Sequence, residues 1–407
     1  MDRSPSISGP REPRQARRVD AAGPMKGGAV RQVDIVVIGG GIAGLSAAMR
    51  LARRARTVVI EREGALGYHS SGRSATFSHF GIGDAAVRGM TAASRPFFET
   101  PPDGFVERPL SFAKPAMFIA TEELIGELRA LESEMTRYTD TITRVSPAEM
   151  LEIVPVLKTG VGGIVEGLLD RSGRKLDSDL LLQACAKAVR AAGGEVVTEA
   201  GAIGLRREGE RWIVDTAGET YSTATIVDAA GAWADEVAIA AGVRPLGLQP
   251  MRRTIIGFDP PEGLDVSAWP FTKTAGDEGF YMLPDAGRLL ASPMDVTPTE
   301  PTDAQPEDFD IALAAWRVEE ATTLEVGRIK AKWAGLRTFT ADKVPTAGFA
   351  PDAPGFFWLA GQGGYGLQTA PAMALATEAL LFGEAWPEEL AAYGVRPDQI
   401  MPDRLFA

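Results

Sequence analysis

The sequence has very little of three chemically useful features: cysteine, histidine and long apolar runs. Its single cysteine, Cys185, excludes an internal disulfide and a cysteine-based zinc site, and it suits a reducing compartment. The only two histidines, His69 and His79, have no partner spacing that indicates a metal site. No apolar run approaches the roughly 18 residues that a membrane span needs. We therefore expect a cytoplasmic protein without an integral membrane span or a bound metal.

Positive charge is also scarce. The 407 residues include 42 Lys and Arg against 54 Asp and Glu, which gives a net charge of −12 at pH 7. An acidic chain argues against nucleic-acid binding, because contact with phosphates needs an excess of cations. Residues 1–30 are rich in Pro, Gly, Ser and Arg and show no apolar period. We predict that they form a disordered tail.

Ordered sequence begins at Val33 with the pattern of a β-turn-α-β unit. Residues 33–38 are apolar and rich in β-branched side chains, as is typical of a buried parallel strand. A glycine-rich turn and a helix over 45–54 follow, and a second strand occupies residues 57–60. The unit is complete within about 30 residues, the length of a mononucleotide-binding βαβ unit.

The glycine-rich turn matches the dinucleotide-binding fingerprint. Gly39 permits the tight turn, Gly41 lets the backbone approach a pyrophosphate, and Gly44 allows the helix to pack closely on the strand. Glu61 ends the second strand, 22 residues after Gly39, where a carboxylate can accept hydrogen bonds from the ribose hydroxyls. Together these features predict a site for an adenine dinucleotide.

The fingerprint alone leaves NAD and FAD open. A second glycine-rich turn, residues 361–366, lies between a buried strand over 356–360 and a helix over 369–381. Two turns that converge on one long cofactor favour FAD, with the pyrophosphate at one end and the isoalloxazine at the other. A plain loop that leads into the last helix is the alternative interpretation of residues 361–366.

Several longer stretches resemble the D-amino-acid oxidase family of FAD-dependent oxidoreductases, and most closely its bacterial D-arginine dehydrogenases. The resemblance runs from about Val33 to near the C-terminus, and it is carried by residues 67–75 (GYHSSGRSA), 91–95 (TAASR), 243–250 (VRPLGLQP), 333–337 (WAGLR) and 362–366 (QGGYG). It implies an α/β fold in which a Rossmann-like FAD-binding domain interleaves with an α+β substrate domain on a mostly antiparallel sheet. We expect the FAD-binding domain in residues 31–80, 166–245 and 334–407, and the substrate domain in residues 81–165 and 246–333.

The resemblance also implies which residues contact FAD. Beside the fingerprint glycines Gly39, Gly41 and Gly44, they are Ala43, Glu61, Arg62, Ser70, Ser71, Gly72, Arg73, Ser74, Ala75, Thr76, Phe77, Ala202, Gly231, Gly363, Gly364, Tyr365, Gly366, Leu367 and Gln368. Some relatives attach their flavin covalently through a cysteine late in the chain. Cys185 is far from that position, so we expect non-covalent FAD.

A substrate with an α-carboxylate needs a cation. Residues 251–256 are predicted to form a strand, so the neighbouring Arg252 and Arg253 point to opposite faces and only one can face the site. The resemblance selects Arg253 and adds Arg337, whose planar guanidinium can bind a carboxylate through two hydrogen bonds. It also places Tyr281 and Gly364 at the site.

The chain departs from the D-arginine dehydrogenases where their pocket is polar. Those enzymes have an acidic residue at the position of Ala116, and a histidine and a tyrosine at the positions of Phe77 and Ile82. A guanidinium buried without a carboxylate partner is costly. We therefore predict an apolar D-amino acid as the substrate rather than D-arginine. His79 remains open between an acid or base, a substrate contact and a structural residue.

The predicted reaction is oxidative deamination of a D-amino acid. Hydride transfer from the substrate Cα to flavin N5 would give an imino acid, which hydrolyses to a 2-oxo acid and ammonia. The arginines would act mainly by orienting the substrate. Two alternatives remain: a sarcosine-like secondary amine oxidase and a flavin-bearing subunit of a larger dehydrogenase complex. The electron acceptor that reoxidises the flavin is left open.

Overall fold

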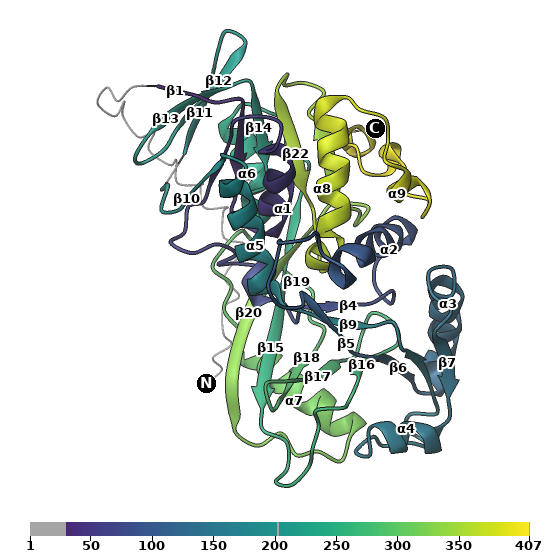
Figure 1. The fold of residues 1–407 in the computed structure, drawn as a ribbon. Coiled ribbons are helices and arrows are strands. Elements are labelled where there is room, and N and C mark those ends of the chain that lie inside the picture. The colour runs from purple at the N-terminus through teal and green to yellow at the C-terminus, as the bar shows by residue number, and fades with distance from the viewer. Residues whose placement is uncertain (1–29, 202, 407) are drawn as a thin grey trace, which may run out of the picture.

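The fold was analysed in a computed structural model, in which residues 30–201 and 203–406 are described. The predicted disordered tail falls outside these ranges apart from Val30, and the predicted FAD contact at Ala202 falls outside them too. Figure 1 shows a long molecule with one large sheet in the upper half and a second in the lower half. Within the described ranges, no helix is both long and apolar enough to cross a membrane.

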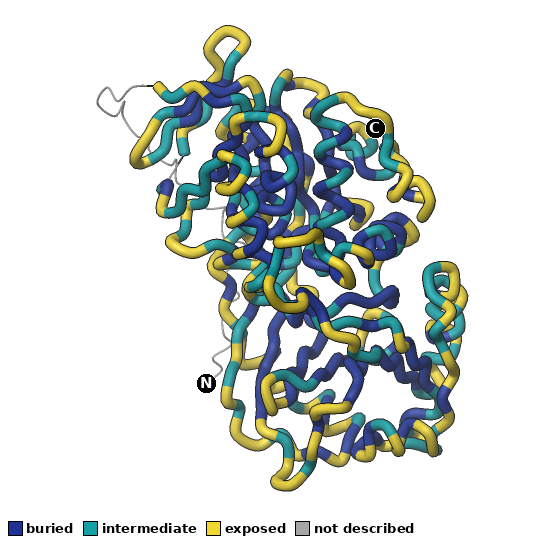
Figure 2. Tube along the Cα trace, viewed as in Figure 1, coloured by how far each residue is buried: buried dark blue, intermediate teal, exposed yellow. Residues whose placement is uncertain are grey.

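The upper sheet has six strands whose order is that of a doubly wound fold. The order is β10 (Glu195–Val197), β3 (Thr57–Ile60), β2 (Ile35–Ile38), β14 (Thr225–Asp228), β22 (Phe356–Ala360) and β21 (Thr346–Phe349). All neighbours are parallel except β21 and β22. The central strands are buried on both faces, as the dark blue tube in Figure 2 shows, which explains why they are apolar without alternation.

Helices cover one face of this sheet. α1 (Ile42–Leu51) packs between α5 (Ser178–Ala191) and α8 (Gly366–Phe382), and their apolar side chains form one core with alternate residues of β2 and β3. The single cysteine, Cys185, lies in this core on α5 and is fully buried, and burial raises the pKa of its thiol to about 12. It is therefore a packing residue.

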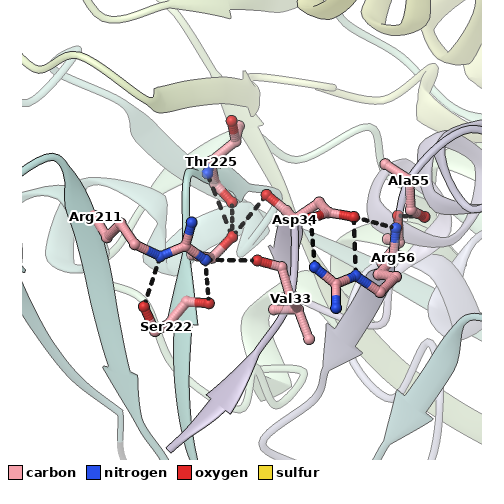
Figure 3. A network of polar contacts seen from close by, with 9 residues as sticks. Val33, Asp34, Ala55, Arg56, Arg211, Ser222 and Thr225 are labelled. Atoms are coloured by element: carbon pink, nitrogen blue, oxygen red, sulfur yellow. Dashed lines mark hydrogen bonds and ion pairs between the residues drawn. The ribbon is translucent and has the colours of Figure 1, made fainter.

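The other face is covered by a small sheet and by α6 (Ala234–Ala240). The small sheet has the order β1 (Arg31–Gln32), β13 (Thr220–Thr223), β12 (Arg211–Asp215) and β11 (Gly204–Glu208). Figure 3 shows how it is tied to the start of β2: Arg211 donates to the carbonyl oxygens of Val33 and Ser222 at 3.0 and 2.8 Å. Asp34, next to Val33, accepts from the backbone and side chain of Arg56 before β3.

The lower sheet has nine strands and is mostly antiparallel. Its order is β19 (Thr297–Pro298), β15 (Gln249–Phe258), β18 (Arg288–Ser292), β17 (Tyr281–Asp285), β16 (Phe271–Thr274), β6 (Ala116–Ala120), β8 (Glu166–Asp170) and β7 (Ile142–Val145), with β20 (Ile329–Phe339) paired to β15. Only β16 and β6 run parallel. The α/β fold with an antiparallel-rich second sheet is thus confirmed.

Alternation along these strands gives the lower sheet two different faces. One face, with Ile256 and Met282, packs under α4 (Pro147–Ile153) and α7 (Asp308–Ala321). The opposite face carries Ile255, Tyr281 and Phe271 toward the six-stranded sheet. The long strands β15 and β20 pair from Gln249 opposite Phe339 to Phe258 opposite Ile329, side by side in Figure 1, and bring this second face up to the upper half.

The predicted domain limits remain predictions, and three segments near them pack differently from that division. α2 (Ala85–Glu99), expected with the substrate domain, packs against α8. β8, expected with the FAD-binding domain, pairs with β6 and β7, and β20, which the limit at residue 334 divides, pairs with β15 over its length. These contacts join residues far apart in the sequence, which local composition does not reveal.

Candidate functional site

A cavity of about 800 Å³ lies where the six-stranded sheet meets β15 and β20. At one end it is lined by the turn after β2 and by the end of β3, and we call the part formed by Gly39, Gly41, Ile42, Ala43 and Glu61 the glycine end. At the other end two arginines line it, and we call the part formed by Arg253, Ile255 and residues 335–338 the arginine end.

A side chain at each of the three fingerprint glycines would meet different surroundings at the glycine end. Gly39 has φ +111°, and a Cβ there would lie 2.4 Å from the carbonyl oxygen of Ala229. A Cβ at Gly44 would lie 2.1 Å from the Gly39 carbonyl oxygen, so α1 packs on the turn only with glycine at this position. A Cβ at Gly41 would meet only the Ser71 hydroxyl, at 3.4 Å, because this position opens into the cavity.

Two helices begin at the cavity. The backbone of Gly41, Ile42 and Ala43 at the start of α1 lines it, and the Ile42 N–H donates to the Ser71 hydroxyl at 3.0 Å. Gly363, Gly364, Gly366 and Leu367 at the start of α8 line it as well. Free backbone N–H groups and the positive end of the helix dipole favour negative charge at both places.

Glu61 holds the shape of the glycine end. Its two carboxylate oxygens accept from the Gly40 and Glu63 backbone N–H groups, at 2.7 and 2.8 Å. Each oxygen keeps a further lone pair, and Glu61 lines the cavity, so the carboxylate can still accept hydrogen bonds from hydroxyls of a ligand.

The loop over residues 67–75 forms one wall. Ser70 donates to the Leu336 carbonyl oxygen at 2.7 Å, and Arg73 donates to the Ala304 carbonyl at 3.0 Å and pairs with Asp303 at 2.5 Å. Ser70 therefore fastens the loop to the arginine end, and Arg73, whose charge Asp303 neutralises, fastens it to residues 303–304. Trp333 on β20 donates to the Arg73 carbonyl oxygen and completes this junction.

Arg337 is the exposed cation of the arginine end. Its side chain is half-buried, lines the cavity and lies against Gly364, where a Cβ would sit 3.3 Å from the Arg337 Cδ and Nε. Among the described residues, none forms a hydrogen bond or an ion pair with the Arg337 guanidinium. A planar group with five donors that faces a cavity without a partner is suited to bind a carboxylate of a ligand.

Arg253 lies beside it in a more enclosed position. It is 9% exposed, and its Nε donates to the Asp295 carbonyl oxygen at 2.6 Å and lies 3.8 Å from the Asp295 carboxylate. Burial, followed by the like charge of Arg337, lowers the pKa of Arg253 below its ordinary value. As alternation predicts, the neighbouring Arg252 points to the other face, where it pairs with Asp310 at 2.9 Å.

Tyr281 extends the same face of the sheet. It is 4% exposed, and its hydroxyl has no hydrogen-bond partner within the described chain. Its ring lies 5.4 Å from Phe271, which stacks on Phe77 at 4.7 Å. A buried hydroxyl without a partner is costly unless a ligand supplies an acceptor. Tyr281 is therefore placed to donate to a ligand.

His79 is buried and is held by a hydrogen bond and by aromatic packing. Its Nδ1 accepts from the Gly81 N–H at 3.0 Å, and its ring stacks on Phe271 at 5.1 Å. Burial, followed by the positive charge of Lys273, lowers the pKa of His79 to about 3. The ring is neutral at ordinary pH, with one nitrogen already accepting, so it is poorly suited to act as a base.

Most of the predicted site residues that the structure describes line the cavity, and eight do not. The residues that line it are Gly39, Gly41, Ala43, Glu61, Arg62, Ser70, Ser71, Arg73, Ser74, Ala75, Gly231, Arg253, Arg337, Gly363, Gly364, Gly366 and Leu367. Those that do not line it are Gly44, Gly72, Thr76, Phe77, Ile82, Tyr281, Tyr365 and Gln368.

Two of the residues outside the lining have a clear packing role. Ile82 packs against the core that α1, α2 and α8 share, which differs from the predicted pocket wall. The Gln368 side chain is 2% exposed and links the His79 carbonyl oxygen to the Thr91 hydroxyl, so it binds α8 to α2. Contacts between segments so far apart in the chain cannot be predicted from local sequence patterns.

Sequence reasoning missed a further wall of the cavity. His69, Trp233, Glu236, Val237 and Ile239 line it. Four of them follow β14 on the segment that leads into α6, of which only Gly231 was predicted. The signal available was the position itself, because loops after the carboxyl ends of parallel strands form the ligand crevice in such sheets.

The arrangement suits a long dinucleotide. Pyrophosphate can lie against the start of α1, where Gly41 leaves the backbone bare, and a ribose can bind Glu61. The α8 start lies along the same cavity and offers further N–H groups. A flavin that gains negative charge on reduction would be stabilised there. The residues present therefore fit FAD.

Comparison with known proteins agrees with this assignment. Glycine oxidase from Geobacillus kaustophilus is 24% identical over 394 residues, which cover 89% of this chain and 96% of that protein. Among solved structures, L-α-glycerophosphate oxidase from Mycoplasma pneumoniae with FAD bound has a TM-score of 0.78 at 19% identity, with 88% and 96% of the two chains covered. L-amino acid deaminase from Proteus vulgaris has a TM-score of 0.75 at 16% identity, with 93% and 99% covered.

The family assignment rests on the length of the matched segment. The family described as FAD dependent oxidoreductase matches residues 34–380, which include both glycine-rich turns, both arginines and most of the two large sheets. The chain therefore belongs to this DAO family of FAD-dependent oxidoreductases, and its cofactor is FAD.

Proposed function

We propose that the chain catalyses the oxidative deamination of D-amino acids. The observation that carries the proposal is Arg337, a cation that lines the cavity beside Gly364 and has no hydrogen-bond or ion-pair partner among the described residues. The names of the relatives agree with an amino-acid substrate, since they include a glycine oxidase and an L-amino acid deaminase. The D configuration comes from the sequence resemblance alone.

The proposed roles follow from these positions. Arg337 binds the substrate α-carboxylate through two hydrogen bonds, Arg253 adds a second positive charge, and the Tyr281 hydroxyl donates to the same carboxylate. These contacts orient the Cα–H bond and supply most of the protein's contribution to the rate. FAD, when bound, would supply the two-electron acceptor for the hydride that leaves Cα. The amine nitrogen loses a proton, and water then converts the imino acid to a 2-oxo acid and ammonia.

We also propose that FAD is held non-covalently by the predicted residues that line the cavity. The only cysteine lies in the α5 core, away from the lining residues. Heat or acid should then release FAD into the supernatant and leave a colourless precipitate. Colour that stays with the precipitated protein would contradict this proposal.

We propose that the site binds a substrate with a cationic side chain less well than one with an uncharged side chain. Phe77 stacks on the ring of Phe271, and Ala116 pairs with Phe271 on the neighbouring strand. The face of the lower sheet is therefore apolar around Phe271. Lys273, which lies opposite Tyr281 on the neighbouring strand, and Arg253 are cations that would repel a guanidinium. The narrower resemblance to D-arginine dehydrogenases therefore does not extend to D-arginine as the preferred substrate.

The deciding experiment is a panel of D- and L-amino acids mixed with the FAD-loaded protein without oxygen. Loss of the yellow flavin absorbance with D-amino acids is the expected result. Reduction only by L-amino acids would refute the D configuration, and reduction only by N-methylglycine would support the sarcosine-like alternative. A protein that no amine reduces would fit the flavin-bearing subunit of a larger complex.

A further inference from the structure

A third cation shares the face of the lower sheet that carries Arg253 and Tyr281. Lys273 lies on β16 directly opposite Tyr281 on β17, so the two side chains point to the same face. Phe271, two residues before Lys273, belongs to the aromatic cluster on that face. Lys273 therefore lies beyond Tyr281, on the side away from the paired strands β15 and β20.

The Lys273 ammonium is held in place without being neutralised. Its Nζ donates to the Thr274 and Gly276 carbonyl oxygens, both at 2.9 Å. An ammonium has three donors, so one N–H is left over. No carboxylate among the described residues lies within ion-pair distance of it, and the nearby Asp277 and Glu278 are exposed.

The balance of charge around Tyr281 is positive. Asp295 lies 3.8 Å from Arg253, whereas Arg337 and Lys273 have no ion-pair partner among the described residues. Burial, followed by the charges of Arg253 and Arg337, lowers the pKa of Lys273 to about 8, against an opposing effect of Asp277. A single α-carboxylate neutralises only one of the two remaining cations. A half-buried cation without a counter-ion is unfavourable, so a second negative charge is expected from the ligand.

We propose that the substrate carries a second anionic group at the end of its side chain, and that Lys273 is the residue that binds it. The proposal rests on the proposed function, because it takes the α-carboxylate to lie at Arg337. The substrate class is then acidic amino acids of the length of glutamate. The apolar wall with Phe77 and Phe271 contacts the methylene groups between the two carboxylates, which reconciles that wall with a charged end.

Binding of two matched acids tests the proposal without turnover. Glutarate and pentanoate both have five carbons and differ in one carboxylate. Isothermal titration of the FAD-loaded protein near pH 7, where the Lys273 ammonium is mostly protonated, should give a Kd for glutarate about tenfold or more below that for pentanoate. Equal affinity for the two acids would overturn the proposal.

Variants then assign the difference to Lys273. Lys273→Met should abolish most of the preference for glutarate over pentanoate, and Lys273→Arg, which keeps the charge, should restore part of it. Lys114→Met is the matched control: Lys114 also donates to a backbone carbonyl, that of Ser267, but it lines a separate surface pocket. A preference that survives Lys273→Met would overturn the assignment. If Lys273→Met fails to fold, Lys273→Arg and the two acids on the native protein still decide.

Turnover separates this proposal from the proposed function. D-glutamate should exceed the nearly isosteric but neutral D-glutamine in kcat/KM by about tenfold or more, mainly through KM. If D-leucine reduces the flavin and D-glutamate does not exceed D-glutamine, the second-anion proposal fails while oxidative deamination stands. If no amino acid reduces the flavin but glutarate still binds more tightly than pentanoate, the proposed function fails instead.

Discussion

The two ends of the cavity are built in different ways. The glycine end uses backbone N–H groups and one carboxylate, all from residues 39–61. The arginine end uses side chains from β15 and β20, of which Arg253 and Arg337 are 84 residues apart. Backbone groups bind the pyrophosphate and ribose of FAD, which are the same whatever the substrate is. Side chains on a sheet can be substituted one at a time without a change of the backbone. The cofactor end therefore tolerates little variation, and the substrate end sets specificity.

The largest effect is expected at the glycine end. Gly44→Val places a Cβ 2.1 Å from the Gly39 carbonyl oxygen, a backbone atom that cannot move away. We expect a loss of more than about 4 kcal/mol of stability, with loss of bound FAD. The FAD-to-protein absorbance ratio and the melting temperature measure both.

A matched control is Gly126→Ala on α3 (Ile125–Met135), where a Cβ meets nothing within 4 Å. It should leave FAD content unchanged and raise stability by up to about 1 kcal/mol. Normal FAD content in Gly44→Val would show that the glycine end tolerates a side chain. The proposed difference between the two ends would then be wrong.

At the arginine end, Arg337→Met removes a cation and leaves the backbone and its packing in place. The substrate carboxylate then loses its bidentate partner, so kcat/KM should fall by roughly 10²–10³-fold. FAD content should stay near normal, since the glycine end is untouched. Steady-state kinetics and the flavin absorbance are the two measurements. A variant that loses its FAD instead would show that the two ends are not independent.

The stability of the folded protein is expected to fall at acid pH because of His79. The folded-state pKa of His79 is about 3, below the value of about 6.5 of an unfolded chain. Between these values the unfolded state binds a proton that the folded state excludes. Stability is therefore fully present above about pH 6.5 and falls by up to about 1.4 kcal/mol per pH unit on acidification.

Urea unfolding at about pH 7 and about pH 4.5 measures this dependence. His79→Asn keeps an acceptor for the Gly81 N–H but does not titrate, so its stability should fall less between the two pH values. Carboxylates titrate in both proteins, so the difference between them isolates His79. An identical loss in both would place the acid sensitivity elsewhere.

The smallest effect is expected from Tyr281→Phe. The variant removes a buried hydroxyl that has no partner in the described chain, so stability should stay the same or rise slightly. Loss of one hydrogen bond to the substrate carboxylate should lower kcat/KM by about 5–10-fold, mostly through KM. Thermal unfolding and kinetics check the two parts. A fall in stability without a kinetic effect would mean that the hydroxyl serves the fold.

The amino-acid sequence by itself determined the glycine end. Gly39, Gly41, Gly44 and Glu61 lie within 23 residues, and their spacing follows from the geometry of one βαβ unit. The choice of FAD over NAD followed from the second glycine-rich turn, residues 361–366, and the family followed from the resemblance of several longer stretches. Strand alternation also separated Arg253 from Arg252, because adjacent residues of a strand point to opposite faces.

Only the tertiary structure decided which distant side chains meet. The place of Ile82 in the helical core, the wall formed by Trp233 and Ile239, and the position of Lys273 opposite Tyr281 depend on strand order and register. Register depends on packing across the whole sheet, and a shift by one residue would turn Lys273 to the other face. For this reason the cofactor and the two arginines could be predicted from the sequence, whereas the place of Lys273 opposite Tyr281 became visible only when the nine strands were assembled.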